Sequence, residues 1–237
     1  MKIGIIGTGN MGRILIEAFI DSGFIDPSDV FVTNRTKEKA ERLQNNYPHL
    51  HVMDDAVEVI ERSDVLFICV KPIDIYSLLR KTADSFSRDK LLISITSPVA
   101  VNELESVVDC SVARAIPSIT NRALSGVSLI TFGESCGEKE RKDLIEIMGA
   151  ISKPYEIEEN ITRVASDIVS CGPAFFTYLT ERFIQAAKSK TEISEEQATA
   201  FASEMLIGMG QLLKKNFYTL PSLREKVHVK GGVTGVG

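Results

Sequence analysis

The sequence predicts an α/β protein with a doubly wound parallel sheet at its N-terminal end and an all-helical region behind it. Short apolar runs alternate with amphipathic stretches over residues 1–158, and the runs are rich in Val and Ile. Strands of that kind are typical of a parallel sheet that is covered by helices on both faces. A glycine-rich turn follows the first run, and only helical patterns follow the last one.

The expected elements alternate in order along the chain. Strands are predicted at residues 3–7, 30–33, 51–53, 65–70, 91–95, 112–116, 127–132 and 155–157. The helices predicted between them include residues 11–22, 36–47, 56–62 and 73–86. Gly23 suits the end of the first helix, because glycine readily adopts the left-handed conformation found there. We therefore place one domain at residues 1–158.

Helical patterns fill residues 159–237, which we predict to be a second, smaller domain. A helix over residues 161–170 is expected to end at Cys171-Gly172-Pro173. Glycine permits a break there, and proline suits the first turn of the next helix, which runs to about residue 188. Ser194 and Gln197 then form a capping box for a long helix.

The last helix carries a wide apolar face that includes Phe201, Met205 and Met209. A small helical domain cannot cover such a face alone. We therefore predict a homodimer or higher homo-oligomer that forms through the C-terminal helices. The alternative interpretation is that this stripe is the domain's own core.

The composition argues against several classes of function. The net charge is -5 and the basic clusters are short and mixed with acids, so no nucleic-acid partner is expected. No apolar run approaches the roughly 20 residues of a membrane span, and the first strand begins too near Met1 for a signal peptide, so we expect a cytoplasmic protein with no membrane partner. The four cysteines form no ligand pair, and His49 and His51 lack a completing ligand, so no metal site is predicted.

The turn Gly7-Thr8-Gly9-Asn10-Met11-Gly12 directly follows the first apolar strand and opens a helix. Gly7 allows the tight turn, Gly9 lets the backbone approach a pyrophosphate, and Gly12 allows close packing of helix on strand. The helix start adds free N–H groups and the positive end of the helix dipole. The turn therefore predicts a Rossmann domain that binds a dinucleotide.

The end of the second strand indicates which dinucleotide binds. An acidic residue there would accept hydrogen bonds from the ribose of NAD and repel a 2′-phosphate, but the strand ends in Asn34-Arg35-Thr36. A guanidinium beside amide and hydroxyl groups suits a phosphate, which favours NADP(H) and leaves NAD(H) as the second candidate. Alternatively, Arg35 is a surface charge and Asn34 or Thr36 caps the next helix.

Val70-Lys71-Pro72 follows the fourth predicted strand, at the edge of the sheet where such folds hold their ligands. Lys71 is therefore a candidate to contact ribose or phosphate. A purely architectural role is an equal alternative, because proline stops a strand and turns the chain.

Several short segments, taken in their order along the chain, carry a resemblance to a known family. They are residues 7–12, 34–36 and 70–72, Ile93-Ser94-Ile95, Arg114-Ala115-Ile116-Pro117, Cys171-Gly172-Pro173-Ala174 and Gly231-Gly232-Val233-Thr234. In this order and approximate spacing they resemble the pyrroline-5-carboxylate reductase family over the whole chain. The chain is most similar to the late-competence, ComER branch of that family.

The resemblance implies an oxidoreductase that transfers a hydride from NAD(P)H to the C=N carbon of a cyclic imino acid, 1-pyrroline-5-carboxylate, and so forms L-proline. It implies that residues 7–12, 34–36 and 70–72, with Ser94 and Pro117, contact the cofactor. The substrate-binding residues that it implies are Lys230, Gly231, Gly232, Val233 and Thr234, with the catalytic role at Thr234. Family members pair through their C-terminal helices and continue beyond the position of Gly237, so we expect a truncated helical domain.

The sequence departs from the family pattern at the substrate end. Val229-Lys230-Gly231-Gly232-Val233-Thr234 stands where reductases usually have Ser-Pro-Gly-Gly-Thr-Thr, so two hydroxyls are lost. Two hypotheses therefore stay open: an imine reductase, and a nucleotide-binding regulatory protein of the ComER type with weak or no turnover. The 3-hydroxyacid dehydrogenases are disfavoured, because they use a helix-borne lysine that residues 173–187 lack.

Overall fold

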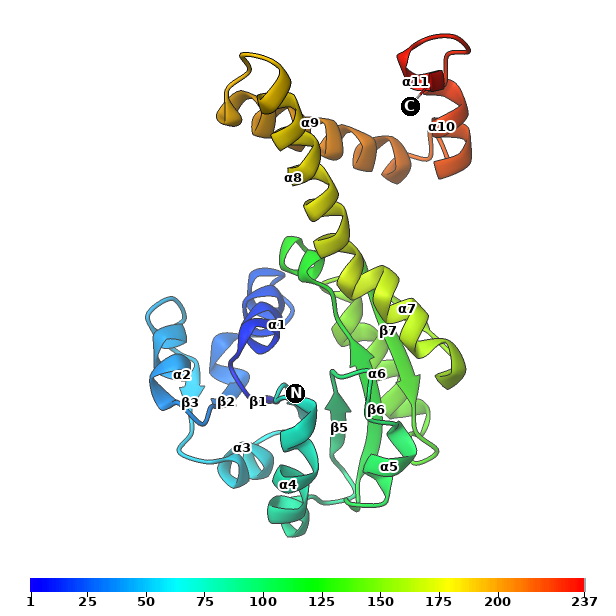
Figure 1. The fold of residues 1–237 in the computed structure, drawn as a ribbon. Helices are drawn as coiled ribbons and strands as arrows, with labels where there is room; N and C mark the ends of the chain where they lie inside the picture. Colours follow the sequence, from blue (N-terminus) through cyan, green and yellow to red (C-terminus); the bar gives the residue numbers. More distant parts are fainter. Residues whose placement is uncertain (237) are drawn as a thin grey trace. The chain divides into compact units, whose positions relative to one another are not determined.

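The structure of the chain is a computed structural model that describes residues 1–236 (Figure 1). Gly237, the last residue of the predicted helical domain, lies outside the described residues. The chain divides into two compact units, Met1–Pro173 and Ala174–Gly237. The predicted fold class is confirmed, because a largely parallel, Rossmann-like sheet is followed by helices alone.

The first unit is built on one eight-stranded sheet with the strand order β3-β2-β1-β4-β5-β6-β7-β8. Its strands are β1 (Ile3–Ile6), β2 (Val30–Thr33), β3 (His51–Val52), β4 (Val65–Ile68), β5 (Leu91–Ser94), β6 (Ser111–Ile116), β7 (Val127–Phe132) and β8 (Lys153–Glu156). Strand β1 pairs in parallel with both β2 and β4, so the strand order reverses at β1. Ligands of doubly wound sheets bind at the carboxyl ends of the strands beside such a reversal.

Strands β6 and β7 pair antiparallel, whereas the other neighbouring strands of the described sheet pair in parallel. Residues 117–126 connect the two strands, and a parallel connection needs about a dozen residues or more, usually including an α-helix. The connection contains the 3-10 helix η3 (Ile119–Ala123) and ends at Gly126, whose φ is +81°. The predicted parallel sheet therefore contains one antiparallel pair.

Alternate residues of each strand pack into two apolar cores on opposite faces of the sheet. Ile5 and Phe67 belong to one core, and their neighbours Ile6 and Leu66 belong to the other. Three helices contribute to the first core: α1 (Asn10–Asp21), α2 (Lys37–Gln44) and α6 (Glu138–Gly149). Three more contribute to the second: α3 (Ala56–Arg62), α4 (Pro72–Thr82) and α5 (Val101–Glu105). The continuous apolar character of the strands follows from this burial on both faces.

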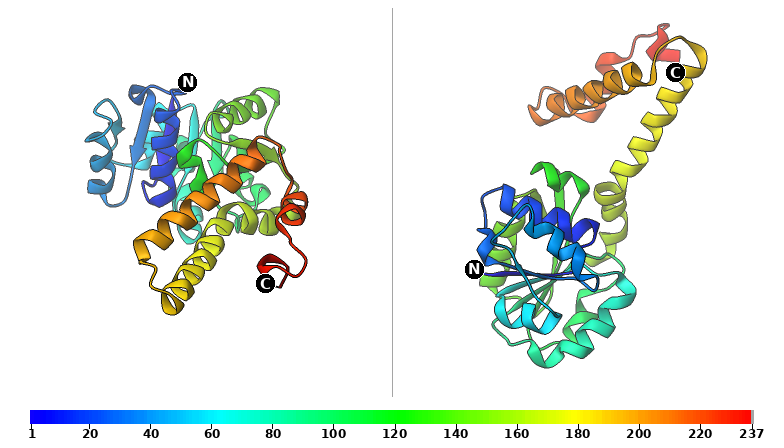
Figure 2. Two further views of the ribbon diagram at one scale, coloured as in Figure 1. Left: turned by 90° about the horizontal axis from the view of Figure 1, so that it is seen from above. Right: turned by 90° about the vertical axis from the view of Figure 1, so that its left-hand side faces the viewer.

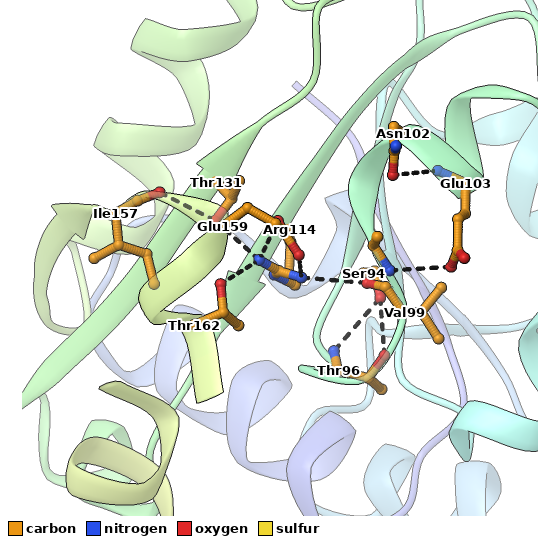
Figure 3. A network of polar contacts seen from close by, with 11 residues as sticks. Ser94, Thr96, Val99, Asn102, Glu103, Arg114, Thr131, Ile157, Glu159 and Thr162 are labelled. Atoms are coloured by element: carbon orange, nitrogen blue, oxygen red, sulfur yellow. Dashed lines mark hydrogen bonds and ion pairs between the residues drawn. The ribbon is translucent and has the colours of Figure 1, made fainter. Parts of the chain in front are cut away.

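Arg114 on β6 is fully buried and ties the segment after β8 to the sheet (Figure 3). Its Nη2 donates to Oε2 of Glu159 at 2.7 Å and to Oγ1 of Thr162 at 2.6 Å, and its Nη1 donates to Oε1 of Glu159 at 3.0 Å. Further bonds reach Oγ1 of Thr131 and the carbonyl of Val99. This two-pronged ion pair holds the first turn after the last strand against the sheet.

Two serine hydroxyls hold the next part of the chain at the end of β6. Oγ of Ser118 donates to the carbonyl of Val169 at 2.8 Å, and Oγ of Ser170 donates to the carbonyl of Pro117 at 2.6 Å. Together with the Arg114 contacts, these bonds join residues 159–171 to the sheet. The compact first unit therefore extends to Pro173, beyond the boundary that the sequence predicts before residue 159.

The prediction that a helix ends at Cys171-Gly172-Pro173 is wrong. After the 3-10 turn η4 (Glu159–Ile161), helix α7 (Thr162–Ser166), a π-helical segment (Asp167–Cys171) and helix α8 (Gly172–Lys190) follow one another directly. Gly172 keeps a right-handed helical conformation, with φ -49° and ψ -45°. A π turn is a known insertion in α-helices, and here it lets the helix continue past a proline that has no N–H to donate.

The second unit contains most of α8 together with α9 (Glu195–Lys214), α10 (Leu220–Val227) and α11 (Val233–Val236). Helices α8 and α9 form a hairpin (Figure 2) in which Ile184 packs against Ala198 and Ala202. The predicted capping box is confirmed, because Oγ of Ser194 accepts from the N–H of Gln197 at 3.1 Å. Many large apolar side chains of this unit stay exposed, including Phe175, Phe176, Phe183, Phe201 and Met205.

Within residues 1–236, no helix combines the length and the apolar character that a membrane span requires.

Replacement of Glu159 by Ala is expected to lower the free energy of unfolding of the first unit by about 2 kcal/mol. The change leaves the buried guanidinium of Arg114 without its carboxylate, and the loss is smaller than for a fully buried pair because half of Glu159 is exposed. Urea denaturation followed by circular dichroism measures it. Glu158→Ala, an exposed neighbour, is the control and should change stability by less than about 0.5 kcal/mol; equal losses in both variants would contradict the anchoring role.

Candidate functional site

A pocket of about 530 Å³ lies at the carboxyl ends of β1, β2 and β4, within the first unit. It collects residues from three of the segments that the sequence predicts to bind a cofactor. The predicted residues that line it are Gly7, Gly9, Asn34, Arg35, Thr36, Val70 and Lys71.

The three glycines of the first turn meet different steric conditions. Gly7 has a φ of +103°, and a Cβ there would lie 2.6 Å from the carbonyl oxygen of Cys69. A Cβ at Gly12 would lie only 2.0 Å from the carbonyl oxygen of Gly7, so α1 starts directly against the end of β1. A Cβ at Gly9 would meet no atom within 4 Å. The fold therefore needs glycine at positions 7 and 12, whereas Gly9 leaves open space beside the pocket.

The start of α1 offers hydrogen-bond donors without a protein acceptor. Gly9 is the N-cap residue and makes no side-chain cap, and the first helical bond runs from the N–H of Arg13 to the carbonyl of Gly9. Oγ1 of Thr8 is buried and has no hydrogen-bond partner within the described chain. Amides at a helix start carry the positive end of the helix dipole, so this end of the pocket suits an anionic ligand.

Asn34 connects the first turn to the loop after β2. Its Oδ1 accepts from the N–H of Thr8 at 3.0 Å, and its Nδ2 donates to the carbonyl of Thr36 at 2.9 Å. Thr36 is the N-cap residue of α2, as the alternative interpretation has it, but its side chain makes no capping hydrogen bond. The amide of Asn34 therefore positions two pocket loops relative to each other.

Basic side chains outnumber acidic ones around the pocket: Arg35, Lys37, Lys39, Lys71 and Lys81 face Asp54, Asp55 and Asp74. The side chain of Arg35 is 87% exposed, and its nearest carboxylate oxygen, on Asp74, lies 4.0 Å away. Lys37 pairs with Asp54, and their hydrogen bond raises the pKa of the lysine and lowers the pKa of the aspartate. Lys39, Lys71 and Lys81 form no ion pair within residues 1–236, so the pocket attracts anions.

Several lining residues were not predicted from the sequence. Asp54 and Asp55 follow the short strand β3, so the rule that ligands bind at carboxyl ends of strands applies to them as well. Asp74, Leu78 and Lys81 come from α4, where their spacing places them on one helix face. The position after a strand and the spacing along one helix face can both be seen in the sequence. They indicate pocket residues only when it is known which strands and helices surround the pocket.

The ligand-binding and the architectural interpretations of Val70-Lys71-Pro72 apply to different residues of this segment. Lys71 lines the pocket, and it is also the N-cap residue of α4. Pro72 is the first residue of that helix and is not a lining residue of the pocket. Pro72 therefore has the architectural position, and Lys71 has the position open to a ligand.

Ser94 and Pro117 do not line this pocket. Ser94 ends β5 and is fully buried, with its Oγ 3.2 Å from Oγ1 of Thr96 (Figure 3). Pro117 follows β6 and is buried, and its carbonyl accepts the Ser170 hydroxyl described above. Both residues nevertheless stand at carboxyl ends of strands in the same sheet.

The predicted substrate residues form one turn in the second unit. Gly231 has a φ of +79°, and the N–H of Gly232 donates to the carbonyl of Val229 at 2.9 Å. Oγ1 of Thr234 accepts from the N–H of Val229 at 3.1 Å, which leaves the hydroxyl proton of Thr234 to donate elsewhere. Val233 is 91% exposed. Lys230, Gly231, Gly232, Val233 and Thr234 are thus neighbours on one exposed turn.

His51 and Cys69 pack against neighbouring groups in the part of the chain that the structure describes. It contains no group of three or more His, Cys, Asp or Glu side chains arranged around a common metal position. The ring of His51 stacks on Phe31 with 4.8 Å between centroids. Cys69 belongs to the pocket wall, but burial raises the pKa of its thiol, which therefore stays protonated at neutral pH.

Two family models match the chain. Residues 2–98 match the model described as "NADP oxidoreductase coenzyme F420-dependent". Residues 159–237 match the model described as "Pyrroline-5-carboxylate reductase dimerisation". The first match includes the whole pocket, and the second includes the turn at Thr234.

The chain is similar to curated proteins over its full length. It is 57% identical to ComE operon protein 4 of Bacillus subtilis (strain 168) and 28% identical to pyrroline-5-carboxylate reductase 3 of the same strain, and each alignment covers 100% of this chain and 87% of the relative. Among solved structures, Plasmodium falciparum pyrroline carboxylate reductase with NADP bound has a TM-score of 0.89 at 23% identity, with 100% of this chain and 87% of the other covered. The chain therefore belongs to the pyrroline-5-carboxylate reductase family.

Proposed function

We propose that the protein is an NADPH-dependent imine reductase that converts 1-pyrroline-5-carboxylate to L-proline. The pocket of the first unit carries the coenzyme-binding part of the proposal. It combines open space at Gly9, the uncapped start of α1, the unpartnered buried hydroxyl of Thr8 and a surplus of cations. These groups fit the pyrophosphate and the 2′-phosphate of NADP(H). Membership of the family supports the reductase assignment.

Each pocket loop has its own role in this proposal. The amides at the start of α1 hold the pyrophosphate, the guanidinium of Arg35 binds the 2′-phosphate beside Thr36, and Lys71 contacts ribose or phosphate. Ser94 and Pro117 are proposed to contact the cofactor from the ends of β5 and β6. Bound NADPH supplies a hydride to the carbon of a C=N bond. The chain's own contribution is mainly to orient the two reactants.

The turn of the second unit is the proposed substrate site. The amides of Gly231 and Gly232 and the ammonium of Lys230 suit a carboxylate, and the free hydroxyl proton of Thr234 suits the ring nitrogen. We propose residues 159–237 as the substrate and dimerisation domain. The match of the dimerisation model to that range and the exposed phenylalanines of α8 and α9 support a homodimer or higher homo-oligomer.

A regulatory, nucleotide-binding function with weak or no turnover is the second candidate. The relative with 57% identity is ComE operon protein 4, whereas pyrroline-5-carboxylate reductase 3 of Bacillus subtilis has 28% identity. Val229 and Val233 also remove two hydroxyls from the turn that the proposal assigns to the substrate. Cofactor binding is common to both candidates, so only turnover separates them.

Oxidation of NADPH with 1-pyrroline-5-carboxylate, with L-proline formed in equal amount, is the expected result for the wild-type protein. Thr234→Val should lower kcat by about tenfold or more, because it removes a hydroxyl whose contact strengthens as the nitrogen gains charge. Thr234→Ser keeps the hydroxyl and should restore most of the rate. Tight NADPH binding with no proline formed would reject the reductase and favour the regulatory candidate.

Gly9→Ala should weaken NADPH binding by about tenfold or more without destabilising the protein. The new Cβ meets no protein atom within 4 Å, but it occupies the space through which a pyrophosphate approaches the backbone. Calorimetric titration gives the Kd, and urea denaturation gives the stability. Gly149→Ala, where a Cβ also meets no atom within 4 Å, is the matched control and should leave the Kd unchanged. Unaltered NADPH binding by the Gly9 variant would remove the pyrophosphate from this turn.

Arg35→Ala should weaken NADPH binding by about tenfold and leave NADH binding nearly unchanged. The expected loss corresponds to a charge-assisted hydrogen bond of about 1.5 kcal/mol to the 2′-phosphate, which NADH lacks. Arg88→Ala is the control, because that side chain is 86% exposed, as Arg35 is 87% exposed, and it lies outside the pocket. An equal loss for both coenzymes would refute the role assigned to Arg35.

A further inference from the structure

The pocket contains an acidic residue that the pattern at the end of β2 does not reveal. Coenzyme preference is normally read at the end of the second strand, where this chain has Asn34-Arg35-Thr36 and no acid. Asp54 follows β3, yet it lines the same pocket as Arg35 and Thr36. A carboxylate therefore stands among the groups proposed to bind the 2′ position of the adenosine ribose.

The carboxylate of Asp54 is paired with the ammonium of Lys37, which lies in the first turn of α2 and also lines the pocket. These two groups have opposite preferences for a ligand. An ammonium attracts a phosphate, whereas a carboxylate repels it and accepts a hydrogen bond from a ribose hydroxyl. Asp54 has no second cationic partner within residues 1–236. Its negative charge is therefore neutralised while Lys37 is paired with it, and faces a ligand in the pocket when Lys37 is not.

The Lys37–Asp54 pair is accessible and weak. The side chains of Lys37 and Asp54 are 52% and 75% exposed, and exposed ion pairs of this kind contribute little to stability. A ligand can therefore separate them at small cost. Arg35 is independent of this pair, because its nearest carboxylate oxygen belongs to Asp74.

We propose that the Lys37–Asp54 pair selects between the two reduced coenzymes, an inference that rests on the proposed function of the pocket. When NADPH binds, Lys37 leaves Asp54 and joins Arg35 at the 2′-phosphate. When NADH binds, Asp54 stays available and accepts a hydrogen bond from the 2′-hydroxyl. The pair thus lets one pocket hold both coenzymes, and its two members set their relative affinity in opposite directions.

The test compares calorimetric Kd values of NADPH and NADH for wild type, Asp54→Asn and Lys37→Gln in low salt. Asp54→Asn should strengthen NADPH binding about fivefold, because one unit charge near the phosphate is removed, and it should weaken NADH binding. Lys37→Gln should weaken NADPH binding about fivefold or more and change NADH binding little. Raising the salt concentration should shrink both effects on NADPH, because the charges are exposed to solvent.

Arg88 and Asp109 provide a matched control pair in the same unit. Their ion pair is similarly accessible, with side chains 86% and 76% exposed, and neither residue lines the pocket. Arg88→Gln and Asp109→Asn should leave the ratio of the two Kd values within about twofold of wild type.

Opposite shifts of that ratio in Asp54→Asn and Lys37→Gln would support the proposal. An unchanged ratio, or shifts in the same direction, would overturn it while leaving coenzyme binding itself intact. Wild-type protein that binds neither coenzyme would instead overturn the proposed function, and the selection mechanism with it. Circular dichroism of each variant checks the fold, and both substituted side chains are solvent-exposed.

Discussion

The close approach of Gly12 to the carbonyl of Gly7 is the constraint on which the pocket depends. A methyl group at position 12 would lie 2.0 Å from that oxygen, so α1 can start against the end of β1 only because Gly12 lacks a side chain. This contact places the start of α1 between the loops that follow β2 and β4. The free amides of α1 and the open space at Gly9 therefore lie beside the cations that line the same pocket.

Charged residues of the first unit serve two separable purposes. Arg114 is buried, its Nη atoms bond to Glu159 and Thr162, and it fixes a helical turn to the sheet. Arg35 and Lys37 are exposed and line the pocket. Solvent screens the exposed group, so its charges contribute little to folding and remain available to a ligand. Stability and ligand preference can therefore change independently in this fold.

Much of the fold could be predicted from the sequence because its signals are local. Buried parallel strands are continuous apolar runs, and the predicted bounds of β2 and β7 agree with the structure. The first turn was also predictable, since Gly7 and Gly12 meet steric conditions that are local to a tight strand-to-helix turn.

The features that were missed depend on contacts between distant segments. The antiparallel pairing of β7 follows from a short connection whose path no local pattern encodes. The helix continues through Gly172 and Pro173 because a π turn forms where Ser118 and Ser170 hold the backbone. Asp54 and Lys81 join the pocket only after β3 has paired in the sheet and α4 has packed against it. Propensity and periodicity carry no information about such arrangements.

The amide of Asn34 couples two loops mechanically. Its oxygen is engaged by the backbone of the first turn and its nitrogen by the carbonyl of Thr36, so rotating the amide breaks both bonds together. The loop proposed to bind the adenosine end and the turn proposed to bind the pyrophosphate are therefore expected to order as one body. A small ligand that binds only beside Arg35 is therefore expected to restrict the motion of the glycine turn as well. Its effect on binding at that turn would then extend beyond the atoms that it contacts.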